Sequence, residues 1–64
     1  MTTYKLFNPA NSCYTYYTTQ GNDKMMVQNF DGMHNAIEAA DVVSVELARK
    51  WWKNQLDRGM IRIK

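Results

Sequence analysis

The segment at residues 44–59 limits the possible folds more than any other part of this 64-residue chain. Ser44 is a favourable helix N-cap, Glu46 suits the first turn, and Gly59 readily takes the left-handed conformation that follows a helix. On a helical wheel, four apolar side chains form one continuous stripe: Val45, Ala48, Trp52 and Leu56. The segment therefore predicts an amphipathic helix over residues 45–58 that packs this stripe on the rest of the domain.

Trp51 falls outside that apolar stripe. On the wheel it lies between Leu47 and Gln55, with Arg58 beside it. Most charged residues of the helix fill the opposite side: Glu46, Arg49, Lys50, Lys53 and Asp57. The wheel assigns Trp52 to the core, and it leaves open whether another part of the chain covers Trp51 or a partner does.

The first half of the chain has the composition of β-strands. Turn-forming residues in 8–12 and 20–23 separate three runs rich in apolar, β-branched and aromatic residues: 3–7, 13–19 and 24–30. Three strands with two tight connections predict an antiparallel meander. Alternation along the second strand directs Tyr14 and Tyr16 to one face and Tyr17 to the other, and tyrosine suits either a buried or a wet face.

Two shorter elements complete the predicted fold. The apolar residues at 33, 36, 37 and 40 have helical spacing, which predicts a short helix over 33–40. Ile61 and Ile63 alternate with basic residues, which predicts a short final strand over 60–63. The chain is short enough for one core, so we expect a single α+β domain over residues 1–64.

The C-terminal segment SVELARKWWKNQLDRGMIRI resembles a pattern in small proteins of unknown function from cyanobacteria and their phages. That pattern has Ser or Thr, an acidic residue, Ala-Arg, an apolar residue before Trp, and Gly followed by an aromatic residue. Eight positions match it: Ser44, Glu46, Ala48, Arg49, Trp51, Trp52, Leu56 and Gly59. Gln55 stands where the pattern usually has Leu, and Met60 where it has an aromatic residue. The resemblance implies a small cytoplasmic accessory protein, with a cyanophage as one candidate source, and it brings no known activity.

Composition favours a reducing compartment for this protein. Cys13 is the single cysteine, so no intramolecular disulfide can form. The first twelve residues lack the apolar core of a signal peptide, and the sequence contains no apolar run of about 18 residues that could span a membrane. We therefore expect a cytoplasmic protein without a membrane segment.

No residue pattern in the sequence indicates catalysis. Cys13 and His34 are the only candidate nucleophile and base, and nothing in the sequence brings them together. A metal site needs three or four ligands, whereas Asp31 with His34 makes only a weak pair. The glycines are isolated, so no phosphate-binding loop is present. We expect a protein that is not an enzyme and needs no metal or cofactor.

Protein binding is the function that the sequence favours. Three features are typical of a chain that contacts another protein. They are a marginal core, the apolar pair Trp51 and Leu47 beside the helix stripe, and five methionines. We expect an accessory protein that binds and modulates a host protein or itself, and a homodimer through a sheet edge is one form that self-binding could take. The residues expected to contact the partner are Trp51, Leu47, Arg58, Tyr14 and Tyr16.

Nucleic-acid binding is the alternative. Residues 44–64 hold six basic and two acidic side chains, a net charge of +4, whereas residues 1–43 hold two basic and four acidic ones, a net charge of −2. Five basic residues of the helix and tail would contact phosphates: Arg49, Lys50, Lys53, Arg62 and Lys64. Tyrosines on an exposed sheet face could stack on bases. Against this alternative, Glu46 and Asp57 can pair with lysines on the same side of the helix.

Overall fold

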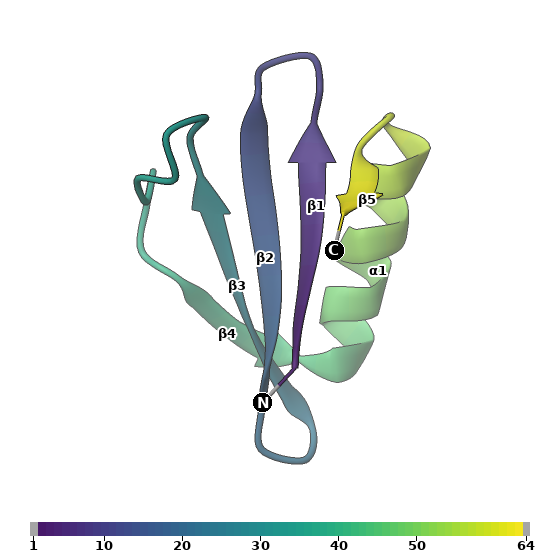
Figure 1. Ribbon diagram of the computed structural model, residues 1–64. Helices are drawn as coiled ribbons and strands as arrows, with labels where there is room; N and C mark the ends of the chain where they lie inside the picture. The colour runs from purple at the N-terminus through teal and green to yellow at the C-terminus, as the bar shows by residue number, and fades with distance from the viewer. Residues whose placement is uncertain (1, 64) are drawn as a thin grey trace.

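The three predicted strands form a meander at the centre of a larger sheet (Figure 1). The computed structural model describes residues 2–63. In chain order its elements are β1 (Thr3–Asn8), β2 (Cys13–Gln20), β3 (Lys24–Phe30), β4 (Asp41–Ser44), α1 (Val45–Asp57) and β5 (Ile61–Ile63). The strands make one antiparallel sheet in the order β4-β3-β2-β1-β5. The predicted α+β class is confirmed.

Polar side chains shape the turn between β1 and β2. The Asn8 carboxamide oxygen accepts a hydrogen bond from the backbone N–H of Ala10 at 3.0 Å, and the Asn11 oxygen accepts one from Cys13 at 3.0 Å. These are the local bonds by which asparagine favours turns over strands. The hairpin brings Tyr4 opposite Tyr17 and fixes the register of the central strands.

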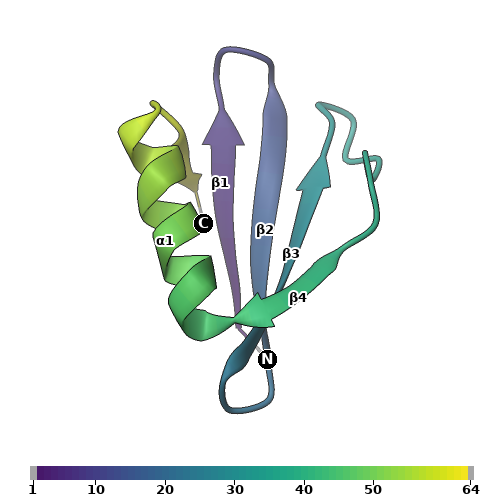
Figure 2. The same ribbon diagram turned by 180° about the vertical axis from the view of Figure 1, so that it is seen from behind.

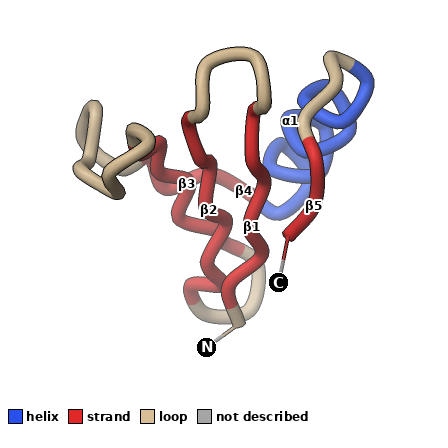
Figure 3. Tube along the Cα trace, turned by 45° about the horizontal axis from the view of Figure 1, so that its top comes forward, coloured by secondary structure: helices blue, strands red, loops and turns tan. Residues whose placement is uncertain are grey.

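Helix α1 connects the two edges of the sheet. It follows β4 directly, because Ser44 ends the strand and its hydroxyl also caps the helix by accepting a hydrogen bond from the Leu47 N–H at 3.2 Å. At the other end, Gly59 has a φ of 99° and turns the chain into β5. Seen from behind, α1 lies in front of β5, and the edge strand β4 crosses in front of the lower parts of β2 and β3 (Figure 2); the tube view also places the helix on one side of the sheet (Figure 3).

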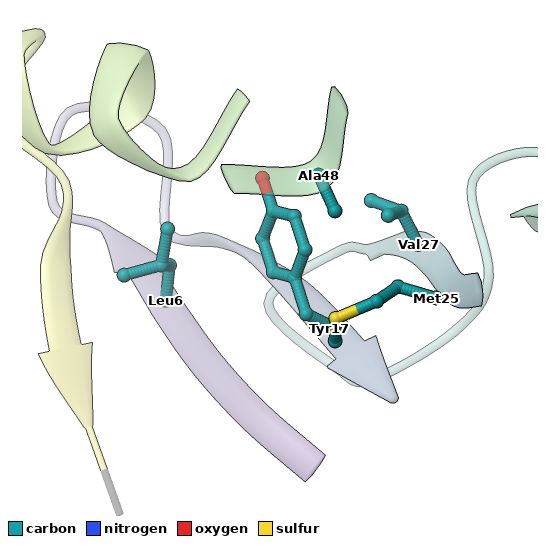
Figure 4. Packing of buried hydrophobic residues seen from close by; sticks show 5 residues of the cluster. All are labelled: Leu6, Tyr17, Met25, Val27 and Ala48. Atoms are coloured by element: carbon teal, nitrogen blue, oxygen red, sulfur yellow. The ribbon is translucent and has the colours of Figure 1, made fainter. Parts of the chain in front are cut away.

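The core lies between the sheet and the helix. Five buried side chains form it (Figure 4): Leu6, Tyr17, Met25, Val27 and Ala48. Trp52 packs against this cluster, with its ring edge-to-face on Tyr17 at a centroid distance of 5.2 Å. The prediction that Trp52 and Ala48 belong to the core is confirmed.

The predicted helix over 33–40 is wrong. After β3 the chain forms an irregular loop that is held by its own polar groups, and the Asp31 carboxylate accepts hydrogen bonds from the N–H groups of Met33 and Asn35 at 2.9 Å each. Met33 and Ile37 are 83% and 56% exposed. A helical apolar stripe needs a surface to bury it, and this segment has none.

Residues 41–44 form a strand that the sequence did not predict. β4 pairs with β3, and Val43 lies opposite Met25. The strand is only four residues long, so its sequence alone does not distinguish it from a loop that connects two elements.

The predicted position of Leu56 in the core is also wrong. Leu56 is 39% exposed, and the neighbouring Gln55 is half-buried facing the sheet. The buried side of α1 therefore centres on Ala48 rather than between Val45 and Trp52. The reason is chemical, because the facing sheet offers Thr15 as a polar partner for Gln55, at 3.4 Å between the Gln55 amide nitrogen and the Thr15 hydroxyl oxygen. Within residues 2–63, the single helix is too short and too polar to cross a membrane.

Candidate binding surface

The sheet has two faces, and α1 covers only one of them. Leu6, Tyr17 and Val27 point toward the helix, so the residues that alternate with them point to the other side. We call that second side the open sheet face. Its residues are Thr3, Lys5, Phe7, Tyr14, Tyr16, Thr18, Gln20, Lys24, Met26, Gln28, Phe30, Val42, Ile61 and Ile63.

Ring side chains gather at one end of the open sheet face. We call them the aromatic cluster: Phe7, Tyr14, Tyr16, Phe30 and His34. Phe7 lies 5.0 Å from Tyr14, and Tyr16 lies 4.9 Å from Phe30, both between ring centroids. The four sheet rings are half-buried and come from the three central strands, so the scaffold holds them in place. The four sheet rings therefore form a preorganised apolar platform.

His34 reaches this platform from the loop after β3. Its imidazole stacks on the Tyr14 ring at 4.4 Å with an interplanar angle of 24°. The residue has a φ of 64°, and its N–H donates a hydrogen bond to the Asp31 carbonyl at 3.0 Å. Hydrogen bonds from the backbone N–H groups of Asn35 and then Met33 lower the pKa of the exposed Asp31 carboxyl. The ionised carboxylate thus holds the loop that presents the histidine.

The open sheet face carries basic residues and no acidic ones. The ammonium of Lys5 lies 5.2 Å from the centroid of the Tyr16 ring, and Lys24 lies further along the same face. All six acidic residues of the chain lie elsewhere, in the β2–β3 turn, in the loop after β3, on the helix side of β4 and on α1: Asp23, Asp31, Glu38, Asp41, Glu46 and Asp57. The open sheet face therefore carries positive charge only.

A polar groove lies on the other side of the sheet, beside the second half of α1. We call it the helix-side groove. Its volume is about 210 Å³, and its lining includes Trp51, Arg58, Glu38, Asp41 and Gln55.

A chain of hydrogen bonds runs under this groove. The Tyr17 hydroxyl donates to the Gln55 carboxamide oxygen, and the Thr15 hydroxyl donates to the Asn29 oxygen at 2.7 Å. The Asn29 amide then donates to Glu38 at 2.9 Å. Burial raises the pKa of Tyr17 to about 12. Among residues 2–63, every buried side-chain polar atom has a hydrogen-bond partner, so this network stabilises the fold and leaves no unsatisfied group for a ligand.

The residues predicted to contact a partner divide between the two sides of the sheet. Tyr14 and Tyr16 lie in the aromatic cluster. Trp51 is half-buried against the core and, with Arg58, lines the helix-side groove, while Leu47 is 38% exposed on α1.

Sequence reasoning missed four residues of the candidate surface: Phe7, Phe30 and Lys5 on the open sheet face, and His34 in the loop that reaches it. Pairing the predicted strands in antiparallel register would have placed Phe7 and Phe30 beside Tyr14, because directly opposite residues share a face.

Four basic residues of the nucleic-acid alternative do not share a surface with Tyr14 and Tyr16: Arg49, Lys50, Lys53 and Arg62. Arg49, Lys50 and Lys53 are exposed on α1, on the opposite side of the sheet from the aromatic cluster. The Arg62 guanidinium lies 5.9 Å from the Tyr4 ring, also on the helix side. Lys64 lies outside the described residues. The basic residues and the tyrosines that the alternative combined therefore do not form one continuous surface.

The candidate catalytic and metal residues are dispersed. Cys13 faces the helix side, where its thiol lies 3.6 Å from the Asn11 carbonyl oxygen, whereas His34 lies over the open sheet face. In the part of the chain that the structure describes, no three His, Cys, Asp or Glu side chains are grouped so that they could hold a metal ion.

Comparison of the chain with protein-family models, with curated proteins and with solved structures finds no match. The functional interpretation therefore depends on the geometry of the surface itself.

Proposed function

We propose that this chain is a non-enzymatic accessory protein that acts by binding a macromolecular partner on the open sheet face. The observation that carries the proposal is the aromatic cluster, which lies on the side of the sheet that α1 does not cover. A sheet with one covered face normally presents polar residues on the other. Aromatic side chains there are better explained by a contact than by the fold.

The construction of the aromatic cluster supports this role. Tyr14 and Tyr16 alternate along β2, the central strand, and the other two sheet rings flank them on β1 and β3. Aromatic side chains have few rotatable bonds, and the rings of the aromatic cluster are already held in place by their neighbours. Binding would therefore cost little side-chain entropy. The cytoplasmic location favoured by the single cysteine, and the cyanobacterial or phage origin suggested by the C-terminal segment, are parts of the same proposal.

Site-specific photocrosslinking in the producing cells tests the proposal. A benzophenone amino acid in place of Tyr16 is expected to form adducts of higher mass, because it lies within the aromatic cluster. The matched control replaces Lys50, which is exposed on α1 on the other side of the sheet. Equal adducts at both positions, or adducts at position 50 alone, contradict the proposal.

The helix-side groove supports a second candidate, which is protein docking beside Trp51. The half-buried indole lines an open groove together with Arg58, and Leu47 is exposed on the same helix. A bound protein segment would cover the exposed part of Trp51. The same photocrosslinker in place of Leu47 would then give the adducts, and position 16 would give none.

Self-association through a sheet edge is a third form of protein binding. The edge strands β4 and β5 are four and three residues long, which limits the number of ladder hydrogen bonds that a second copy could form. A monomeric mass at micromolar protein concentration would exclude such a dimer.

A further inference from the structure

We infer that the occupant of the open sheet face, on the premise that this face is the binding surface proposed above, is single-stranded nucleic acid. Three observations point to this chemistry. They are the charge of the face, the stacking geometry of its rings, and the position of Lys5 beside one of them.

The charge of the open sheet face favours an anionic ligand. Lys5 and Lys24 are its only residues with a full charge, and no acidic side chain lies on it. Elsewhere in the chain, acidic and basic residues are mixed, as on α1 where Glu46 and Asp57 lie among the basic residues. Lys5 and Lys24 would therefore attract a phosphate backbone, whereas the Asp31 carboxylate, which interacts electrostatically with His34, would repel it only at the His34 end of the aromatic cluster.

The rings of the open sheet face favour a ligand with flat aromatic groups. The protein already stacks one planar heterocycle there, because the His34 imidazole lies on the Tyr14 ring at 4.4 Å and 24°. A nucleobase is the same kind of group, and stacking on aromatic side chains is the usual way that proteins hold unpaired bases. Duplex DNA or RNA hides the faces of its bases, so a single strand fits this platform better.

The lysines lie where the backbone of a stacked strand would run. Lys5 lies directly opposite Tyr16 in the β1–β2 ladder, and its ammonium is 5.2 Å from the ring centroid. A base stacked on Tyr16 would therefore have its phosphate within reach of this charge. Lys24 lies opposite Gln20, which is four residues beyond Tyr16 on β2. Lys24 is therefore about 14 Å from Tyr16, measured along the strand direction. The two ammonium groups would thus contact separate phosphates of one strand.

A second copy of this chain fits the open sheet face less well. In a two-fold dimer the same patch meets itself. Lys5 and Lys24 of one copy would then face a surface that offers cations and no carboxylate, and like charges across an interface weaken it. An acidic protein would satisfy the lysines without needing flat rings, so it is the competing outcome of the experiment.

Fluorescence anisotropy of the full chain with labelled oligonucleotides tests the inference. The probes are fluorescein-labelled oligothymidylate and oligouridylate of about twelve nucleotides. We expect both to bind, since stacking tolerates any base. Two phosphate contacts at a slope of about −0.7 each predict an affinity about seven-fold weaker in about 200 mM NaCl than in about 50 mM.

Substitutions on the two sides of the sheet localise the binding. Tyr16→Ala is expected to weaken it about 5- to 150-fold, the effect of removing one stacked base. Lys5→Gln is expected to reduce the salt effect to about three-fold, because one phosphate contact is lost. The matched control, Lys50→Gln, removes an exposed lysine of α1 and should leave both measurements unchanged. Tyr16→Leu keeps an apolar side chain in the cluster, so it reports the loss of stacking if the alanine variant does not fold.

Each remaining result overturns the inference. If neither oligonucleotide binds at low salt, nucleic acid is excluded, and a protease-sensitive, nuclease-resistant photocrosslink at position 16 would then retain the proposed function with a protein partner. If position 16 gives no crosslink either, both proposals fail. Binding that Lys50→Gln weakens as much as Lys5→Gln assigns the strand to α1. A dimeric mass at micromolar concentration that Tyr16→Ala abolishes assigns the face to a second copy.

Discussion

Replacing Tyr17 with phenylalanine should change how the stability of this protein depends on alkaline pH. The Tyr17 ring is buried in the core, and its hydroxyl donates a hydrogen bond to Gln55. Burial disfavours the phenolate, so the folded protein raises the pKa of Tyr17 from the ordinary 10.0 to about 12. The substitution removes the hydroxyl and keeps the ring.

The sign of the effect follows from the order in which the two states lose the proton. Below about pH 10 the hydroxyl is protonated in the folded and unfolded chains alike, and its contribution to stability is complete. Above that pH the unfolded chain ionises first, so the stability is lost as the pH rises through about 12. With the pKa raised from 10.0 to about 12, about 1.4 kcal/mol of stability is lost by about pH 11, and about 2.7 kcal/mol well above pH 12.

Urea unfolding followed by tryptophan fluorescence measures this loss at a series of pH values. Near neutral pH, Tyr17→Phe should be the less stable variant by about 1 kcal/mol, because the Gln55 oxygen loses its donor. The gap between the two proteins should close near about pH 11, because the natural chain alone has a buried hydroxyl at position 17 to titrate. Other groups that titrate in this range are common to both proteins, so their effects cancel in the difference. Parallel loss of stability in the two proteins would refute the assigned burial of Tyr17.

Four further substitutions test the other parts of the fold. Trp52→Ala should lower the free energy of unfolding by about 3–5 kcal/mol, whereas Leu56→Ala should lower it by under about 1 kcal/mol, and the reverse order in urea unfolding would restore Leu56 to the core. Ser44→Ala should cost about 1 kcal/mol in the same assay, because α1 loses its cap; no loss would show that the hydroxyl does not cap the helix. Asp31→Asn should speed amide exchange of the loop after β3 without changing global stability. Acid should do the same in the natural chain as the pH falls through the lowered pKa of Asp31. Unchanged exchange in NMR would contradict the role of the carboxylate.

Local patterns predicted the elements that carry their own signals. The alternation and composition of β2 and the Ser44 and Gly59 boundaries of α1 are properties of neighbouring residues, and the structure has these elements within one or two residues of their predicted bounds. The loop after β3 shows the limit of such patterns. Helical spacing of apolar residues there had no surface to pack against, and the Asp31 carboxylate offered the backbone a better set of hydrogen bonds.

The candidate surface was harder to predict because it depends on contacts between distant residues. Tyr16 and Tyr17 are chemically alike, and only the docking of α1 decides that Tyr17 is buried and that Tyr16 lies on the open sheet face. In the same way, Gln55 faces the sheet because Thr15 and Tyr17 provide partners there, which the helical wheel alone could not reveal. His34 joins the aromatic cluster through the fold of a loop that carries no regular pattern.

The crossover from β4 through α1 to β5 has a consequence for the order of folding. The three meander strands meet through short turns and can pair early, but β5 pairs with β1, so Ile63 must find Lys5 from nearly the whole chain away. Both outer strands are joined to the same helix, and its docking places them together. Closing such a long loop costs chain entropy, and this cost is offset only when the core contacts between the helix and the sheet form. We therefore expect the two margins of the sheet to gain protection from hydrogen exchange in one late cooperative step, after the hairpins at its centre.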